Sequence, residues 1–448
     1  MAVVGASATP GRVGYSFVQN LKRYGFPGAI YPINPNLKEV QGLTVYPSVL
    51  ALPQRVDLAV VAVSPALVPG IIGECGQKGI PAALVLSAGF AETGGEGQRL
   101  QAEMIRTARQ WGVRLMGPNT QGVINWQDRV ALVGVTIPKG LDQPGPVSFI
   151  CQSALFAWEF AVNAPETGIN KMIDLGNMAD VDHAQALEYL GDDPATRVIV
   201  LEMESLGDGR RLREVAGRVA RRKPVLALKV GRTASGGRAV ASHTGSLSGP
   251  YQLYQAFLRQ TGVLPLEDMD DLLDATRALA YLPPVRGPRV GVLTTTGAGG
   301  AMAADACEDY GLELARLSPE SVARVQATLP PGVPIHNPAD VCQVLDPERL
   351  LPSISAGLEA LDQDPGVDAI AIIGHLLPQT MFHILPALQQ WVLKPDRKPA
   401  VMWAISEEGQ RQHLPPLAQK GLLYCPTIRR ALKSLALAYS FYRRQRDG

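Results

Sequence analysis

Short apolar runs that end in glycine-rich turns divide this chain into recurring strand and helix segments. The apolar runs at 2–5, 146–151 and 289–294 each lead into small residues and then into a helical pattern. Runs of this length are typical of buried strands. Because strands that alternate with helices form parallel sheets covered on both faces, the pattern predicts an α/β fold. Ligands are then expected at the carboxyl ends of the strands.

Further apolar runs and helical patterns fill the segments between these three openings. The predicted strands include 58–63, 82–86, 198–202, 225–230, 369–373 and 400–403. The predicted helices include 97–111, 209–221 and 318–328. The last helix has a clear start signal, with Ser318 as N-cap and Pro319 at the first helical position.

Two proline-rich stretches, 138–146 and 283–288, indicate linkers. A chain of 448 residues suggests about three domains at about 150 residues each. The sequence therefore predicts domains over 1–126, 144–283 and 287–448.

Composition and charge exclude several classes of protein. The net charge is +1, so neither a nucleic acid nor a membrane surface is indicated as a partner. The five cysteines are scattered without Cys-x-x-Cys spacing, which argues against a disulfide framework or a metal site and favours a cytoplasmic location. The first residues enter a strand at once, so no signal peptide is expected, and no apolar run reaches transmembrane length.

A glycine-rich turn at 5–14 follows the first strand and precedes a helix. Glycines there let the backbone approach a pyrophosphate, which the helix amino end also favours. An NAD-dependent dehydrogenase shares this pattern, but it needs an acidic residue after the second strand to bind the ribose. Here that strand ends in Asn34-Pro-Asn36, followed by Lys38. This favours a nucleotide with an additional phosphate, such as coenzyme A, over NAD.

The stretch 223–249 is the most informative part of the chain. An apolar strand leads into a predicted loop of small residues with Arg232, Arg238 and one histidine, His243. Small neighbours leave an imidazole accessible and let backbone amides face an anion. The pattern suggests covalent phosphoryl transfer through histidine, although a surface loop with an incidental histidine is the alternative reading.

The motifs Lys-Pro-Val-x-Ala-Leu-Lys-x-Gly-Arg and Ala-Ser-His-Thr-Gly-Ser-Leu closely resemble the phosphohistidine segment of the NDP-forming acyl-CoA synthetases. This superfamily includes ADP-forming acetyl-CoA synthetases and succinyl-CoA ligases. The resemblance implies a Rossmann-like CoA-binding domain followed by two flavodoxin-like domains, with His243 as the phosphorylated residue. It also implies CoA contacts from the strand-end loops of the first domain, at Gly5, Ser7, Gly11, Asn34, Lys38, Ser64 and Pro65.

The same resemblance implies two helix amino ends that hold phosphate. One follows Cys151-Gln-Ser-Ala-Leu, with Ser153 and Ala154 at the phosphate, where the family commonly has Ser-Gln-Ser-Gly-Ala-Leu. The missing glycine loosens the expected turn. The other is expected at Gly297, Gly299 and Gly300, near the family's Asn-Pro-x-Asp segment at 337–340.

Acidic residues of the second domain complete the expected site. The segment 174–182 resembles a family loop whose Asn177 and Asp180 are expected to line the site. A phosphorylated histidine needs an acceptor on its other ring nitrogen. In the succinyl-CoA ligases a glutamate at a strand end has this role, and Glu204 is preferred to Glu202 as its counterpart.

The implied activity is the interconversion of acyl-CoA, ADP and phosphate with acid, CoA and ATP, through an acyl phosphate and phosphohistidine. The sequence contains no Walker A motif and no ATP-grasp pattern. It therefore resembles an α subunit, whose separate ATP-grasp β subunit would bind ADP or ATP with Mg²⁺, in a heterotetramer. The substrate would be a small carboxylic acid or its CoA thioester. A non-catalytic, CoA-binding regulatory subunit is the alternative.

Overall fold

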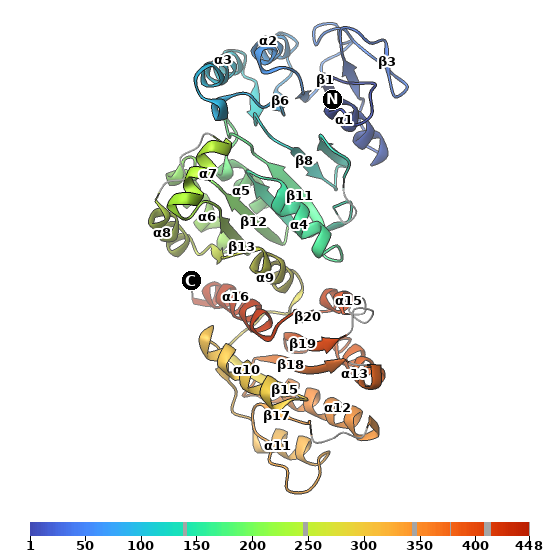
Figure 1. The fold of residues 1–448 in the computed structure, drawn as a ribbon, viewed down its shortest axis with the longest axis vertical. Coiled ribbons are helices and arrows are strands. Elements are labelled where there is room, and N and C mark those ends of the chain that lie inside the picture. Colours follow the sequence, from blue (N-terminus) through green and yellow to red (C-terminus); the bar gives the residue numbers. More distant parts are fainter. Residues whose placement is uncertain (138–140, 245–249, 343–346, 377, 407–413, 448) are drawn as a thin grey trace. The chain divides into compact units, whose positions relative to one another are not determined.

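The computed structural model describes residues 1–137, 141–244, 250–342, 347–376, 378–406 and 414–447. The chain divides into two compact units, Met1–Glu267 and Asp268–Gly448. Strands alternate with helices over most of both units (Figure 1). This confirms the predicted α/β fold class.

The first sheet of unit 1 has five parallel strands in the order β2-β1-β5-β6-β7. Helices follow three of these strands and connect each of them to the next one along the chain. The strands are β1 (Ala2–Val4), β2 (Tyr31–Ile33), β5 (Ala59–Val61), β6 (Ala82–Val85) and β7 (Arg114–Met116), and the helices are α1 (Val13–Arg23), η1 (Pro65–Leu67), α2 (Val68–Gln77), η2 (Ala91–Thr93) and α3 (Gly95–Trp111). A two-stranded ribbon, β3 (Glu39–Val40) and β4 (Leu43–Thr44), follows β2.

Both faces of this first sheet are buried because its apolar side chains alternate between two cores. Val3 packs with Phe17 and Leu21 of α1 on one face. Val4 packs with Ile72 of α2 on the other face. Successive residues of a strand point to opposite faces, so a strand covered on both sides must be apolar throughout.

The second sheet of unit 1 has seven strands in the order β14-β13-β12-β10-β11-β8-β9. Five of them are parallel, namely β10 (Pro144–Cys151), β11 (Ile169–Asp174), β12 (Val198–Met203), β13 (Val225–Lys229) and β14 (Leu264–Leu266). The helices are α4 (Leu155–Asn163), α5 (His183–Asp192), α6 (Gly209–Ala220), α7 (Ala234–Thr244) and α8 (Tyr251–Thr261).

Two features of this second sheet differ from the sequence-based expectation. An antiparallel hairpin, β8 (Gly122–Asn125) and β9 (Val130–Val133), pairs with β11, so the sheet begins at Gly122. Residues 234–244 form helix α7 where a loop was predicted after β13. Thr233 Oγ1 accepts a hydrogen bond of 3.1 Å from Gly236 N and so satisfies an amide at the start of this helix.

Unit 2 has a third parallel sheet in the order β16-β15-β18-β19-β20, with β17 also paired to β15. The strands are β15 (Arg289–Thr294), β16 (Glu313–Leu314), β17 (Ala339–Asp340), β18 (Ala369–Leu376), β19 (Ala400–Ser406) and β20 (Leu422–Tyr424). The helices are α9 (Met269–Tyr281), α10 (Gly297–Asp309), α11 (Pro319–Gln326), α12 (Pro347–Gln363), α13 (Pro378–Trp391), α15 (Pro415–Gln419) and α16 (Ile428–Asp447). Ser318 caps α11 as predicted, because its Oγ accepts a 3.2 Å hydrogen bond from Ser321 N.

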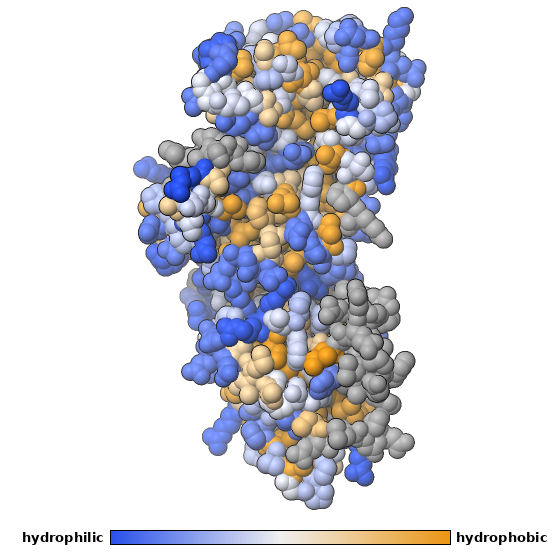
Figure 2. Space-filling view, in the orientation of Figure 1, coloured by the Kyte–Doolittle hydropathy of each residue, from blue (hydrophilic) through white to orange (hydrophobic). Residues whose placement is uncertain are grey.

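Hydrophilic residues cover much of the visible face, and apolar residues also reach it (Figure 2). Helix α4 exposes Leu155 and Val162. None of the helices in the described ranges combines the length and hydropathy that crossing a bilayer requires.

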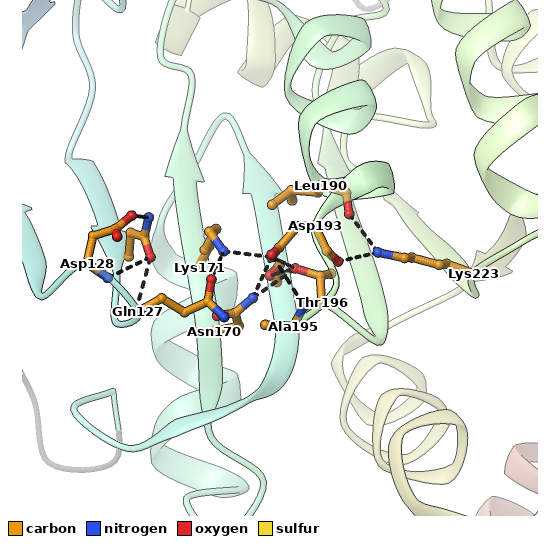
Figure 3. A network of polar contacts seen from close by, with 11 residues as sticks. Gln127, Asp128, Asn170, Lys171, Leu190, Asp193, Ala195, Thr196 and Lys223 are labelled. Atoms are coloured by element: carbon orange, nitrogen blue, oxygen red, sulfur yellow. Dashed lines mark hydrogen bonds and ion pairs between the residues drawn. The ribbon is translucent and has the colours of Figure 1, made fainter.

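A buried ion pair joins β11 to the end of α5 (Figure 3). Lys171 Nζ lies 2.6 Å from Asp193 Oδ2, and both side chains are less than a tenth exposed. Asn170 and Thr196 donate to the same carboxylate oxygen of Asp193. Lys171 also donates to Gln127 Oε1, at 3.0 Å, in the turn between β8 and β9. The pair therefore ties the antiparallel hairpin to the parallel part of the sheet.

Lys171→Met is expected to destabilise unit 1 by about 3–5 kcal/mol, because it leaves Asp193 buried without its counter-charge. Chemical denaturation, followed on the unfolding transition of unit 1, measures the loss. Arg99→Met is the matched control, since it removes an exposed cation on α3 that pairs with Glu96 and Glu103. Equal denaturation midpoints for Lys171→Met and Arg99→Met would contradict a stabilising role for the buried pair.

Candidate active site

The glycine-rich turn after β1 lets α1 start close to the strand ends of the first sheet. Gly5 has a φ of +87°, and a Cβ built there would lie 2.3 Å from Ala62 O. A Cβ on Gly14 would lie 2.0 Å from Gly5 O. No other residue type fits at either position without a shift of the backbone. Arg12, the N-cap of α1, makes no side-chain capping hydrogen bond, so the amino end of α1 is suited to an anion.

Asn34 joins the loops that follow β1 and β2. Its Nδ2 donates to Ala6 O at 2.9 Å, and its Oδ1 accepts from Asn36 N at 2.9 Å. This predicted CoA residue therefore shapes the loop through its own side chain. Lys38 is exposed after the same loop.

The other predicted CoA residues lie after β1 and β5, at the carboxyl edge of the first sheet. Ser7 Oγ accepts from Thr9 N at 3.1 Å, and Gly11 is exposed in the same turn. Ser64 is exposed, and Pro65 begins η1. Because β1, β2 and β5 are parallel neighbours, all seven predicted positions follow strands that end at one edge.

Strand register brings three polar side chains together at the carboxyl edge of the second sheet. Cys151 pairs with Asp174 across β10 and β11, and Ile150 pairs with Leu201 across β10 and β12. Glu202 follows Leu201 on β12, and Gln152 follows Cys151, the last residue of β10, so both lie with Asp174 at the start of the turn into α4.

Glu202 is buried against this turn. Its Oε2 accepts hydrogen bonds from Gln152 N at 2.8 Å and Ser153 N at 3.0 Å. The residue is 0% exposed. Burial, together with the neighbouring carboxylates Glu204 and Asp174, raises the pKa of Glu202 to about 8, although the two amides oppose that shift.

Gln152 positions the backbone around Glu204. Its Oε1 accepts hydrogen bonds from Glu204 N and Ser205 N, both at 2.9 Å. Lys229 Nζ donates to Glu204 O at 2.8 Å from the neighbouring strand β13. Glu204 is itself buried, so the predicted partner of the histidine is held at a defined place beyond the end of β12.

Asp174 lines a pocket of about 400 Å³ together with Ser153, Ala154 and Trp158. Its Oδ2 accepts a 2.6 Å hydrogen bond from Gln121 N. Burial raises the pKa of Asp174 to about 7, which places its titration close to neutral pH. The predicted phosphate residues Ser153 and Ala154 thus line a cavity whose wall carries an acidic group.

Asn177 and Asp180 have partners elsewhere in unit 1. Asn177 Nδ2 donates to Glu92 Oε2 at 2.6 Å. Asp180 accepts from Arg114 Nε at 2.8 Å and from Leu115 N at 2.9 Å. Neither side chain is among those that line the pocket beside α4. Asp180 connects the loop after β11 to β7 of the first sheet.

His243 lies in the last turn of α7, and its side chain is outside the described part of the structure. The motif residues 245–249 that follow it also lie outside the described residues. Helix α7 packs against η2, in the loop after β6 of the first sheet. The helix that carries the histidine therefore adjoins the loop after β6, which belongs to the first sheet but holds none of the seven assigned CoA contacts.

The predicted phosphate glycines of unit 2 begin helix α10. Gly297 and Gly300 line a pocket of about 360 Å³ with His336 and Asp340. Asn337 bridges the sheet instead, since it accepts from Val292 N and donates to Val290 O. Gly299 is buried against Ile373.

Two acidic residues were undervalued by the sequence analysis, namely Asp174 and Glu202. Asp174 is the last residue of β11 and Glu202 the last but one of β12, and β10 lies between those strands. Acidic residues at the carboxyl ends of strands two places apart in a parallel sheet can meet at one edge of that sheet. This signal can be used only when the order of the strands is known. Among the described residues, no group of three or more His, Cys, Asp or Glu side chains is arranged to hold a metal ion.

Comparison with known proteins identifies two parts of the chain. The family model for a CoA-binding domain matches residues 1–126. The model for a succinyl-CoA ligase-like flavodoxin domain matches residues 144–279.

Relatives match over most of the chain. The α subunit of ADP-forming acetate–CoA ligase I from Pyrococcus furiosus is 35% identical over 98% of this chain and 96% of that subunit. ADP-forming acetate–CoA ligase I from Archaeoglobus fulgidus is 38% identical over 88% of this chain, which spans only 56% of that longer protein. Acetyl-coenzyme A synthetase 1 of Ca. Korarchaeum cryptofilum, solved with phosphate and ADP, has a TM-score of 0.87 at 31% identity, over 100% of this chain and 96% of that one.

The chain therefore belongs to the NDP-forming acyl-CoA synthetases, a family of acid–thiol ligases. Within that family it corresponds in extent to a separate α subunit. The predicted family and the predicted correspondence to an α subunit are both confirmed. The predicted succession of a CoA-binding domain and flavodoxin-like sheets is confirmed as well.

The free energy of unfolding is expected to fall as the pH rises from about 6.5 to about 8.5. The pKa of Glu202 is raised from its usual 4.5 to about 8, so the folded state binds the proton more tightly than the unfolded state. The resulting stabilisation is complete below the unfolded pKa and is lost as the pH rises through the folded pKa. Denaturation across this pH range should show a smaller loss of unfolding free energy for Glu202→Gln than for the wild type. The same dependence of unfolding free energy on pH in both proteins would argue against a raised pKa of Glu202.

Proposed function

We propose that this chain is the α subunit that converts acyl-CoA and phosphate into acid, CoA and a phosphohistidine at His243. The observation that carries the proposal is the match to a complete α subunit over 98% of this chain, together with the histidine motif. The packing of α7 against η2 supports it, because the helix that carries His243 adjoins the part of the chain that matches a CoA-binding domain.

In the proposed complex, CoA binds at the carboxyl edge of the first sheet. The uncapped amino end of α1 would receive the pyrophosphate, since Gly5 and Gly14 permit close approach of the backbone. Ser7, Gly11, Asn34, Ser64 and Pro65 would form the surrounding loops. Lys38 would contact the 3′-phosphate.

The first proposed step is attack of a phosphate oxygen on the thioester carbonyl carbon. The carbon–sulfur bond breaks, CoA leaves as the thiolate, and acyl phosphate forms. Ser153 and Ala154 would position phosphate at the start of α4, and Gly297, Gly299 and Gly300 would do the same at α10. Such a reaction depends mainly on positioning and on charge stabilisation.

In the second proposed step, a ring nitrogen of His243 attacks the phosphorus of acyl phosphate and the carboxylate leaves. Glu204 would accept a hydrogen bond from the other ring nitrogen, which fixes the tautomer and strengthens the nucleophile. Its fixed place beyond β12 supports this role. The phosphohistidine would then pass its phosphoryl group to ADP on a separate ATP-grasp β subunit, which supplies Mg²⁺, in a heterotetramer.

One observation favours the alternative of a CoA-binding regulatory subunit. The carboxylate of Glu202 already accepts the Ser153 amide at the start of α4, where the family resemblance predicts phosphate. A chain that binds CoA but is never phosphorylated would fit this alternative.

His243→Ala is expected to abolish acyl-CoA-dependent ATP formation in the presence of the ATP-grasp partner, because the phosphoryl carrier is lost. A coupled assay for ATP measures the activity. CoA affinity, measured by calorimetry, should stay unchanged and serves as the control for folding. ATP formation by the variant at the wild-type rate would rule out the histidine as the carrier.

Lys38→Ala is expected to weaken CoA binding about tenfold, through loss of one charge-assisted contact to the 3′-phosphate. Dephospho-CoA is the matched control ligand, because it lacks that phosphate. Calorimetry should give the same affinity for dephospho-CoA with the wild type and the variant. An equal loss for both ligands would place Lys38 elsewhere than at the 3′-phosphate.

A further inference from the structure

Glu202 is a carboxylate enclosed at the start of α4. Its Oε2 accepts both the Gln152 and the Ser153 amides, and its Oε1 has no hydrogen-bond partner among the described residues. The amino end of a helix favours an anion, through its free amides and the positive end of its dipole. Here a protein carboxylate already accepts the amides of Gln152 and Ser153, which also line the pocket beside α4.

Other acidic groups surround Glu202. Asp174 of β11 and Glu204, which follows β12, both act on it electrostatically. Lys229 of β13 is the nearby cation, and its pKa is lowered chiefly by burial. Because burial and like charges oppose ionisation, the pKa values of Glu202 and Asp174 are both raised toward neutral pH.

The remaining titratable groups around Glu202 stay neutral between about pH 6.5 and about pH 9. His183 of α5 lies with Nε2 3.2 Å from Glu202 O, and burial lowers its pKa to about 4. Burial raises the pKa of Cys151 on β10 and of Tyr254 on α8. Glu202 and Asp174 are therefore the buried acids near this end of α4 whose raised pKa values fall within that range.

We propose that Glu202 tunes the affinity of the α4 amino end for phosphate. The inference rests on the proposed function, in which this helix end receives phosphate. An ionised Glu202 satisfies the amides and repels the incoming anion, whereas a protonated Glu202 adds no charge and permits binding. Phosphate binding at α4 is thus coupled to uptake of a proton by the protein.

Sulfate is the probe for this coupling, because it remains a dianion across the relevant pH range and phosphate does not. Equilibrium dialysis of labelled sulfate with the purified chain measures affinity at about pH 6.5 and about pH 9. Ser153→Glu places a carboxylate in the pocket and should prevent sulfate from binding there. The sulfate bound by the wild type minus that bound by this variant is therefore the sulfate bound at α4. The wild type should bind sulfate about tenfold more weakly at the higher pH.

Glu202→Gln keeps an oxygen that can accept the two amides but removes the charge. It should bind sulfate about tenfold more tightly than the wild type at the higher pH, with a smaller pH dependence whose remainder comes from Asp174. Glu159→Gln, an exposed residue on α4, is the matched control and should behave as the wild type. If Glu202→Gln fails to fold, the wild-type pH series still tests the proposal.

Wild-type affinity that does not change with pH, or a Glu202→Gln variant that binds no more tightly than the wild type, would overturn the proposal. Absence of sulfate at α4 in both proteins would overturn it as well. If His243 is phosphorylated but wild type and Glu202→Gln bind sulfate equally well, the role of Glu202 is refuted and the proposed function stands. Tighter sulfate binding by Glu202→Gln in a chain that is never phosphorylated would instead refute the proposed function alone.

Discussion

The hydrogen bonds from the Gln152 and Ser153 amides to the Glu202 carboxylate are the contact on which the rest of the candidate site depends. They fix the turn between β10 and α4 against the end of β12. The Gln152 side chain then holds the Glu204 backbone, and residues of the same turn line the pocket beside α4. One buried carboxylate therefore sets both the start of α4 and the place of Glu204.

Much of the fold could be predicted from the sequence because its strands are apolar on both faces. Runs such as Val198–Met203 and Arg289–Thr294 are readable without tertiary information. The β8–β9 hairpin was not predictable in this way, since its pairing with β11 is a long-range contact. Helix α7 was missed because its glycine and serine residues are typical of loops, although tertiary packing outweighs such preferences.

The candidate site was predictable to a lesser degree. Glu202 and Glu204 are two residues apart, so the alternation of side chains along a continued strand would place both toward the same face. Sequence alone does not tell which of the two bonds to the turn before α4. That distinction depends on the register of β10 against β12, which brings Gln152 next to Glu202. Asp174 needed the same information, because its strand is adjacent to β10 only in the folded sheet.

The measurement that tests the central claim most directly is phosphorylation of the purified chain with labelled phosphate and acetyl-CoA, followed by other acyl-CoA thioesters. The account predicts an acid-labile, base-stable label that peptide mapping locates on His243. A chain that binds CoA but takes up no label with any thioester, even with its ATP-grasp partner present, would contradict the account and favour a regulatory subunit.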